Sequence, residues 1–405
     1  MFKEQILKIS IRLGVVILFF LILFSVIAFA RGYRIDFKQQ NVTSTGIISV
    51  SAYPRASKVF INGTLRGVTD LNVTLPPGKY QVEVKKDGYT TWTRDVTLKG
   101  ELVVTLDALM FPINPSLSPI TNLGISKLIR VNSDRLLIFT ENGVPEKDGA
   151  YLFELSKSPI SFLPPLKRIL KRSILPEDIS FSSPEATFSP DSKLAVLTFP
   201  QLDSSISYLV NLEEENLQLT DVTNSTETLF ATWEEDRKDE YKKLLELVPK
   251  DIKQIASDSF HIVSTSPDNF KILYFATQSA ELPIVLKPRL VSSNQTEEVR
   301  SLSENHLYVY DKKEDRNYKI SDKQLNSLAK DNPSVLWYYD SQHLVLKETD
   351  KVSMLGYDGK SPTIVYSGPF ETDFFGVTPD GRLLILTNLN SHMNKYPDLY
   401  GIGIR

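Results

Sequence analysis

Cysteine is absent from the 405-residue chain, and histidine is scarce. Without cysteine, disulfide frameworks, thiolate metal sites and cysteine nucleophiles are all excluded. The four histidines stand far apart in the sequence, at His261, His306, His343 and His392. None has a second ligand at metal-binding spacing, so the sequence predicts no metal site and no cofactor.

The chain also lacks a strong charge bias and the short motifs of common enzyme classes. Its formal net charge is −3, which indicates no basic domain of the kind that nucleic acid requires, and no nucleic-acid partner is expected. No nucleophile elbow, P-loop, dinucleotide fingerprint after a predicted strand, or H-E-x-x-H motif is present. We therefore predict that the protein is not an enzyme. A hydrolase that pairs two distant carboxylates stays open, because such a pair leaves no local pattern.

Charged residues are missing from one long apolar stretch, residues 13–30. As a helix this stretch would be about 27 Å long, close to the ~30 Å hydrocarbon core of a bilayer. We predict a transmembrane helix here, with residues 1–12 as a cytoplasmic tail and the remaining chain outside the cytoplasm. The protein would then be a single-pass protein of the cell membrane. Ala28-Phe29-Ala30 also fits a signal-peptidase site, so a cleaved signal peptide is the alternative.

After a predicted linker at residues 31–45, short alternating runs indicate a small antiparallel β-sandwich over residues 46–109. Asn62-Gly63 predicts a hairpin turn, because both residues tolerate positive φ. Pro77-Gly78 predicts a type II turn in which the glycine adopts the left-handed conformation. The next strand places Tyr80 on its apolar face, and Asp87-Gly88 predicts a further turn.

This cassette resembles the PEGA domain. The residues that carry the resemblance are Asn62, Gly63, Pro77, Gly78, Tyr80, Gly88 and Tyr89. Pro77 departs from the family's usual glutamate. The resemblance implies an accessory spacer or interaction module of exported and envelope proteins, in which these residues have structural roles. We expect Tyr80 and Tyr89 to help fill the sandwich core.

One phrase, a tight turn followed by an apolar strand, returns along residues 112–405. The strong copies contain Pro190-Asp191, Pro267-Asp268 and Pro379-Asp380, and weaker copies contain Asp134 and Asp340. Proline and aspartate begin a turn, and the aspartate accepts backbone N–H bonds. The five aspartates stand 57, 77, 72 and 40 residues apart, so the last gap fits one four-stranded blade and the others need insertions or further blades.

These phrases resemble the WD40-like repeats of TolB-type β-propellers. The resemblance implies a degenerate propeller of about six or seven blades. The alternating residues 399–404 predict a closing strand within the final blade, which we expect residues 128–139 to complete or abut. The whole order of segments resembles PEGA-containing, membrane-anchored bacterial proteins.

Two predicted helical insertions interrupt the repeats, near residues 235–257 and 321–333. Their apolar faces either pack on the propeller or dock a partner. Two basic pairs, Lys167-Arg168 and Lys171-Arg172, either belong to a solvated loop or contact anionic lipid or cell-wall phosphate.

These features together predict a mostly β protein with an N-terminal transmembrane helix, a small PEGA sandwich and a propeller. The expected function is that of a membrane-anchored extracytoplasmic binding or scaffolding protein of the cell envelope. The propeller would be the interaction platform and the PEGA domain a spacer. Expected partners are the membrane, through the N-terminal helix, and a protein or a cell-wall polysaccharide. The alternatives are a carbohydrate-active or other hydrolytic propeller, and a sensor or assembly subunit.

Overall fold

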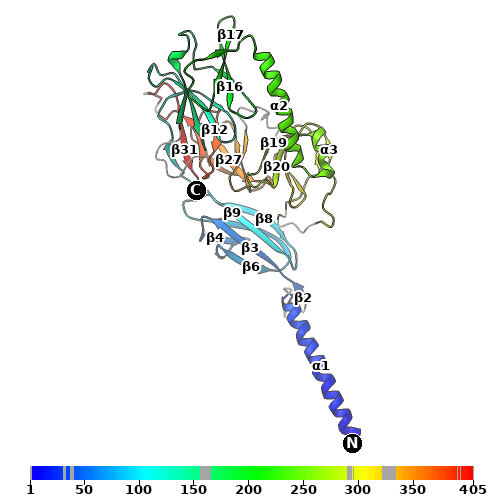
Figure 1. Ribbon diagram of the computed structural model, residues 1–405. Helices are drawn as coiled ribbons and strands as arrows, with labels where there is room; N and C mark the ends of the chain where they lie inside the picture. The colour runs from blue at the N-terminus through cyan, green and yellow to red at the C-terminus, as the bar shows by residue number, and fades with distance from the viewer. Residues whose placement is uncertain are drawn as a thin grey trace. The chain divides into compact units, whose positions relative to one another are not determined.

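The computed structural model describes residues 2–30, 33–36, 41–155, 166–289, 294, 296–321, 334–389, 391–392 and 394–404. The chain divides into two compact units (Figure 1). The first unit contains residues 1–110 with a short later segment, 291–295, and the second contains residues 111–290 and 296–405. Most of the regular structure is β-strand.

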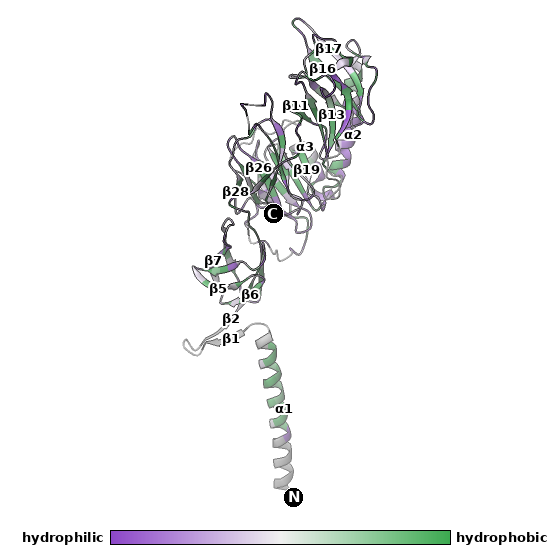
Figure 2. Cartoon of the chain, turned by 90° about the vertical axis from the view of Figure 1, so that its left-hand side faces the viewer, coloured by the Kyte–Doolittle hydropathy of each residue, from purple (hydrophilic) through white to green (hydrophobic). Residues whose placement is uncertain are grey.

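The first unit begins with helix α1, Phe2–Ala30, which includes the apolar run. Its apolar side chains between residues 13 and 27 are exposed on every side of the helix, and Figure 2 shows this part in the hydrophobic colour. Among the residues that the structure describes, no helix combines the length and hydropathy of a membrane span. The predicted linker contains a short hairpin, β1 (Tyr33–Asp36) and β2 (Asn41–Ser44).

Two sheets that enclose one apolar core form the rest of the first unit. The three-stranded sheet has the order β6-β3-β9, with bounds Leu71–Leu75, Gly46–Tyr53 and Val103–Leu109. The four-stranded sheet has the order β5-β4-β7-β8, with bounds Thr64–Val68, Lys58–Ile61, Gly78–Lys85 and Trp92–Leu98. Ile48 and Val50 from one sheet meet Val82, Val84 and Trp92 from the other, because alternate residues of each strand point inward.

Two predictions about this sandwich were wrong. Strands β3 and β9 pair in parallel, so the sandwich is not purely antiparallel. Gly78 is the first residue of β7 and is not among the residues with positive φ, so it does not form a type II turn. Strands β6 and β7 belong to different sheets, and the chain bends at Pro77 between them.

Five four-stranded antiparallel sheets account for most strands of the second unit, and we number them I to V. Sheet I contains β11 (Ile125–Arg130), β12 (Arg135–Thr140), β13 (Gly149–Glu154) and β14 (Leu166–Lys171). Sheet II contains β15 (Glu185–Phe188), β16 (Leu194–Pro200), β17 (Ser205–Asn211) and β18 (Thr220–Asp221). Sheet III contains β19 (Phe260–Thr265), β20 (Lys271–Ala276), β23 (Leu307–Asp311) and β24 (Arg316–Lys319).

The last two sheets complete the set. Sheet IV contains β25 (Val335–Trp337), β26 (His343–Lys347), β27 (Val352–Gly356) and β28 (Thr363–Tyr366). Sheet V has the order β10-β31-β30-β29, with bounds Ser116–Pro119, Asp398–Gly403, Leu383–Thr387 and Phe375–Val377. A separate two-stranded pair contains β21 (Ala280–Glu281) and β22 (Ser301–Leu302).

Each of the five repeat phrases connects two neighbouring strands of one sheet, so five phrases correspond to five sheets. The sequence predicted about six or seven blades, whereas the described residues of the second unit form five four-stranded sheets. In their described residues, the long gaps between phrases contain loops, the helices α2 and α3 and the short pair β21–β22. The longest gap contains α2 (Thr226–Glu246) and α3 (Lys250–Ser259), where a helical insertion was predicted. The second predicted insertion, 321–333, lies outside the described residues except for Ser321.

Apolar clusters join the sheets and helices in sequence around the second unit. Sheet V packs on sheet I, and sheet I packs on sheet II. Sheet II contacts the first half of α2, while the end of α2 and α3 pack on sheet III, as the course of α2 from β16 toward β19 and β20 in Figure 1 illustrates. Sheet III packs on sheet IV. Between sheets IV and V, the hydroxyl of Tyr338 donates to the carbonyl of Gly381 at 3.0 Å.

The C-terminal strand β31 lies between β30 and β10 in sheet V. The predicted closing strand is therefore confirmed. Leu136 and Ile138 of β12 pack on Leu386 and Leu399, so sheet I abuts sheet V. The strand that completes sheet V from the N-terminal side is β10, which the sequence did not predict because its four residues include Pro119 and lack clear alternation.

Candidate functional site

Each Ser/Thr-Pro-Asp turn is closed by hydrogen bonds to its own aspartate. In sheet II, Oδ1 of Asp191 accepts from the Ser189 hydroxyl at 2.7 Å and from the Lys193 N–H at 3.1 Å. These two donors lower the pKa of Asp191, because they stabilise its ionised form. Pro190 precedes the aspartate, and Ser192 follows it with a φ of 56°.

The same arrangement recurs in sheets III and V. After Pro267, Oδ1 of Asp268 accepts from the Ser266 hydroxyl and from the Phe270 N–H, the latter at 3.0 Å. After Pro379, Oδ1 of Asp380 accepts from the Thr378 hydroxyl. In all three turns the carboxylate is hydrogen-bonded within its own turn.

The two weaker phrases form comparable turns with different side chains. In sheet IV, Asp340 accepts from the His343 N–H at 3.0 Å and contacts Nδ1 of His343 at 2.7 Å. In sheet I, the acceptor is Asn132, whose Oδ1 accepts from the N–H groups of Asp134 and Arg135, both at 3.0 Å. The sequence assigned this role to Asp134, and the structure corrects it, since Asn132 occupies the position from which a side-chain oxygen reaches both donors.

These turns also contact one another between neighbouring sheets. Nη2 of Arg135 donates to the carbonyl of Ser192 at 2.7 Å, which joins the turns of sheets I and II. The N–H of Asp268 donates to the hydroxyl of Ser341 at 3.0 Å, which joins sheets III and IV. The repeat turns therefore hold sheet to sheet as well as strand to strand.

Arg130 also lies between two sheets, and sequence reasoning did not single it out. Its guanidinium donates to the carbonyl of Phe375 at 2.5 Å and lies 5.4 Å from the ring centre of Phe374. Burial lowers the pKa of Arg130 to about 10. An isolated arginine at the end of a strand carries no sequence signal for this contact.

The basic residues of β14 and the following turn are engaged within the protein. Nε of Arg168 pairs with Glu215 at 2.8 Å, and this hydrogen bond raises the pKa of Arg168. Lys167 donates to the carbonyl of Glu213. The expected solvated loop is therefore wrong for these residues, because Lys167, Arg168 and Lys171 belong to the strand Leu166–Lys171.

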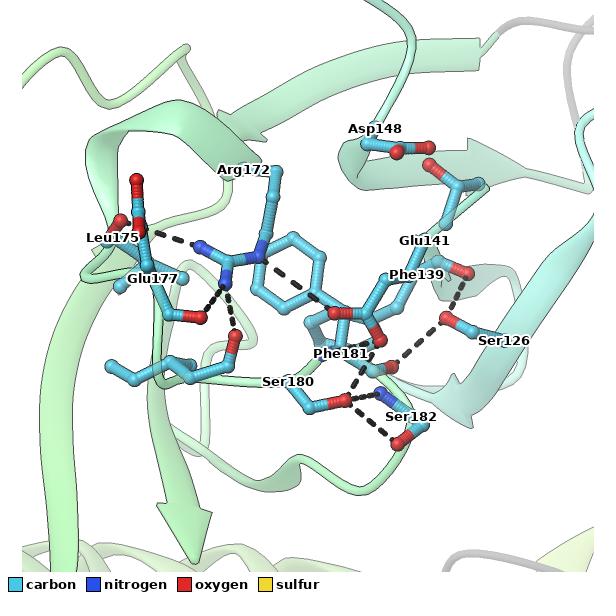
Figure 3. A network of polar contacts seen from close by, with 12 residues as sticks. Ser126, Phe139, Glu141, Asp148, Arg172, Leu175, Glu177, Ser180, Phe181 and Ser182 are labelled. Atoms are coloured by element: carbon cyan, nitrogen blue, oxygen red, sulfur yellow. Dashed lines mark hydrogen bonds and ion pairs between the residues drawn. The ribbon is translucent and has the colours of Figure 1, made fainter. Parts of the chain in front are cut away.

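Arg172, in the 3₁₀ turn η1 (Arg172–Ile174), organises the connection from sheet I to sheet II. Figure 3 shows its guanidinium near the ring of Phe181, 5.7 Å from the ring centre, with dashed lines to several carbonyl groups. The four carbonyl groups that accept from it belong to Leu175, Pro176, Glu177 and Ile179. Glu141 lies 3.8 Å from Nε of Arg172 and accepts from the Ser180 hydroxyl. Arg172 thus supports a loop and is not presented to an external anion.

In the sandwich, the motif residues lie at turns and at the edge of the core. Asn62 and Gly63 connect β4 to β5 with φ angles of 48° and 75°, and Oδ1 of Asn62 accepts from the Gln81 N–H at 2.8 Å. The hydroxyl of Tyr80 donates to the carbonyl of Pro76 at 2.8 Å, while its ring packs against the core. Tyr89 also packs against this core.

The remaining turn residues of the motif differ in backbone conformation. Gly88 has a φ of 81°, and the N–H of Tyr89 donates to the carbonyl of Lys86 across this turn. Pro77 is exposed beside the edge of the sheet.

The sandwich topology and these turns define one module. Residues 45–111 match the PEGA domain family. The match covers the PEGA domain alone and assigns no family to the sheets that follow.

Metal-binding groups are not found among the described residues: no three His, Asp or Glu side chains gather there in a way that could hold a metal ion. Two of the four histidines have polar contacts within the protein. His343 contacts Asp340, and Nδ1 of His306 lies 2.8 Å from the carbonyl of Glu304.

Comparison with curated proteins finds no match to this chain. Among solved structures, a protein assigned as TolB from Agrobacterium tumefaciens is similar at 12% identity, with 73% of each chain covered and a TM-score of 0.21. A protein assigned as a 6-phosphogluconolactonase from Bacteroides uniformis is 11% identical, with 85% of this chain and 95% of that chain covered and a TM-score of 0.17. Hydrazine synthase of Kuenenia stuttgartiensis is 10% identical, with 90% and 96% covered and a TM-score of 0.20.

Proposed function

We propose that this protein is a membrane-anchored, extracytoplasmic binding or scaffolding protein of the cell envelope. The PEGA domain would be a spacer and the five-sheet unit the platform for partners. The observation that carries the proposal is the order of parts along the chain. A helix with exposed apolar side chains precedes a PEGA domain, and a large β unit follows.

The proposed anchor is the apolar run at residues 13–30. A helix that is apolar on every side needs a cover of hydrocarbon or of other apolar helices. The exposed side chains from Leu13 to Ile27 give α1 this character, and the run has the length of a single span. The region after the helix would then lie outside the cytoplasm.

We further propose that sheets I to V form a five-bladed β-propeller in which helices occupy one place between blades. The support is a series of apolar clusters that joins sheets V, I, II, III and IV, with α2 and α3 between sheets II and III, and a hydrogen bond from Tyr338 to Gly381 that joins sheets IV and V. Strand β10 from the start of the unit and β31 from its end complete the same sheet. Such closure is how propellers avoid an open strand edge.

A binding role is favoured over hydrolysis by the state of the repeat-turn carboxylates. Asp191, Asp268 and Asp380 each accept the hydroxyl of the serine or threonine two residues earlier. A general base works best with a pKa near the working pH, whereas the pKa values of Asp191 and Asp268 are lowered below the ordinary aspartate value.

The test combines localisation with partner capture. We expect the full-length protein to stay in the membrane fraction after carbonate washing, and protease added to intact cells to digest the region beyond Arg31. Photo-crosslinkers at exposed positions of the five-sheet unit should capture a specific envelope component. A soluble mature protein that begins at Arg31 would establish the cleaved signal instead, and resistance of the whole chain to external protease would refute the extracytoplasmic location.

A further inference from the structure

The outer face of the three-stranded sheet in the PEGA domain carries a row of uncharged polar side chains. Ser49 on β3 is in register with Asn72 on β6 and with Thr105 on β9, so the row crosses the whole sheet. Asn72 and Thr105 are exposed, and Ser49 between them is half-buried. The next row toward the start of β3 contains Thr74, Ile47 and Val103, all exposed.

The polar groups of this row are available to a ligand. Within the described residues, the side chains of Asn72, Ser49 and Thr105 make no hydrogen bond to the protein. The only carboxylate on this face is Asp107, which accepts from the hydroxyl of Ser51. No lysine or arginine lies on the outward positions of these three strands.

The outer face of the four-stranded sheet differs in character. Its outward positions carry charged side chains, among them Lys58, Lys79, Glu83, Lys85 and Asp95. Lys85 pairs with Glu83 and lies over the ring of Phe60. One face of the domain thus carries many charged side chains, while the row Asn72–Ser49–Thr105 on the other face is uncharged, with Asp107 as the one carboxylate on the outward positions of its strands.

We propose that the outer face of sheet β6-β3-β9 binds a neutral polysaccharide strand through the row Asn72–Ser49–Thr105. This inference rests on the proposed envelope location and names one partner class for it. A hydroxyl both donates and accepts hydrogen bonds, and the amide of Asn72 does the same, which matches sugar hydroxyls and acetamido groups. The neighbouring Ile47 and Val103 offer an apolar surface to the C–H face of a sugar ring.

Geometry and charge favour this occupant over others. Neighbouring strands are separated by about 4.8 Å, so the three side chains form a flat, regularly spaced row rather than a pocket. An extended polysaccharide can lie along such a row, so that successive sugar rings contact the side chains of successive strands. A phosphate-rich polymer would need cations that this face does not carry. A peptide strand would instead pair with the backbone at a sheet edge.

The experiment measures co-sedimentation of the full-length protein, in detergent, with insoluble chitin and with purified peptidoglycan sacculi. We expect wild-type protein to sediment with at least one of them, and Asn72→Ala/Thr105→Val to bind about tenfold more weakly, because two hydrogen bonds are lost. Thr105→Lys should abolish binding by placing a long charged chain across the row. Thr97→Lys, at an exposed position on the outer face of β8, is the matched control and should bind as wild type does.

Failure of this inference and failure of the proposed function are distinguishable. If the wild-type protein binds neither polysaccharide, or if Thr97→Lys weakens binding as much as Thr105→Lys, the polysaccharide face is refuted while the localisation result stands. If Thr105→Lys instead eliminates capture of a protein partner in cells without any polysaccharide binding, the face docks a protein and the inference is overturned. If the protein proves cytoplasmic, the envelope function fails even where chitin binds.

Discussion

A single side-chain oxygen shapes each repeat turn, and the residue that supplies it is not always the one that the sequence pattern indicates. In four sheets this oxygen belongs to an aspartate, and in sheet I it belongs to Asn132. In sheets I to IV this oxygen accepts from backbone N–H groups at the start of the next strand, and in sheet V it accepts from the Thr378 hydroxyl. Every turn thus uses a side-chain oxygen as acceptor, but in sheet I this oxygen lies two residues before the aspartate that the sequence pattern indicates.

Asn132 and Asp134 therefore form a direct comparison. We expect Asn132→Ala to destabilise the second unit by about 1 kcal/mol, because two backbone N–H groups lose their acceptor. Asp134→Ala should change stability by less than about 0.5 kcal/mol, since its carboxylate is exposed. Urea unfolding of both variants measures the difference. Equal losses would show that Asp134 also supports the turn.

Protonation of the turn aspartates should weaken the second unit in acid. Hydrogen bonds from Ser189 and Lys193 lower the pKa of Asp191. Burial opposes the shift in Asp268 and Asp340, yet hydrogen bonds from Ser266 and from His343, respectively, leave their pKa values lowered as well. A folded-state pKa below the unfolded value means that the stabilisation is present above about pH 4 and is lost as pH falls through the folded pKa.

Melting temperature measured between pH 6 and pH 2, in steps of about one unit, tests this expectation. The wild-type protein should lose stability below about pH 4, and Asp191→Asn should show a shallower decline from a lower starting value. Parallel curves for the two proteins would mean that Asp191 contributes nothing to the acid sensitivity.

At the scale of elements, helix α2 packs on both sheet II and sheet III. Trp233, in its first half, packs with Val196 and Val222 of sheet II. Near its end, the Tyr241 hydroxyl donates to the carbonyl of Phe260 in sheet III at 2.7 Å. The amphipathic pattern predicted a helix but left open what covers it, and the two sheets provide that cover.

Tyr241→Phe tests this bridge while keeping the aromatic ring. The variant should lose about 1 kcal/mol, because the carbonyl of Phe260 loses a donor in a half-buried site. Lys242→Ala is the control, since its ion pair with Asp239 is exposed and contributes little. Hydrogen exchange should accelerate in β19 for Tyr241→Phe alone. Unchanged exchange would show that α2 only lies beside sheet III.

The PEGA strand β7 offers a second comparison, between its two faces. Val82 is fully buried in the core and Gln81 is exposed on the opposite face. Val82→Asp should eliminate protection of the β4 and β7 amides from hydrogen exchange, because an unpaired buried charge costs several kcal/mol. Gln81→Asp should retain protection. Retained protection in Val82→Asp would contradict the assigned inward face.

At the scale of the molecule, the second unit depends on its two chain ends meeting in one sheet. Strand β31 pairs with β30 on one side and with β10 on the other. Ile402 and Ile404 near the C-terminus are fully buried. A chain end that is buried on both sides is part of the fold rather than a frayed tail.

Deletion of residues 400–405 should therefore lower the stability of the whole second unit by several kcal/mol, through lost burial and two unpaired strand edges. Leu202→Ser, at a fully exposed hairpin tip, should be neutral. Differential scanning calorimetry and light scattering report melting and aggregation together. A truncated protein that melts as wild type does, and stays monomeric, would show that β31 is not needed for closure.

Local features could be predicted from the sequence because they depend on neighbours along the chain. The Asn62-Gly63 turn, the inward face of β7, the apolar character of α1 and the strands after each repeat phrase all follow from period and turn chemistry. The side-chain contacts of the candidate site could not be predicted in this way. The contacts of Arg130, Arg135 and Arg172 join segments that no sequence pattern relates.

The amino-acid sequence by itself determined the strands that follow the repeat phrases, the positive-φ turns at Asn62-Gly63 and Gly88, and the apolar run within α1. Only the tertiary structure decided how the strands are distributed among sheets. It placed β3 parallel to β9, brought β10 beside β31, put α2 between sheets II and III, and aligned Asn72, Ser49 and Thr105 in one row. The physical reason is that strand partners and shared faces depend on burial between residues far apart in the chain, whereas periodicity and turn propensity act within a few residues.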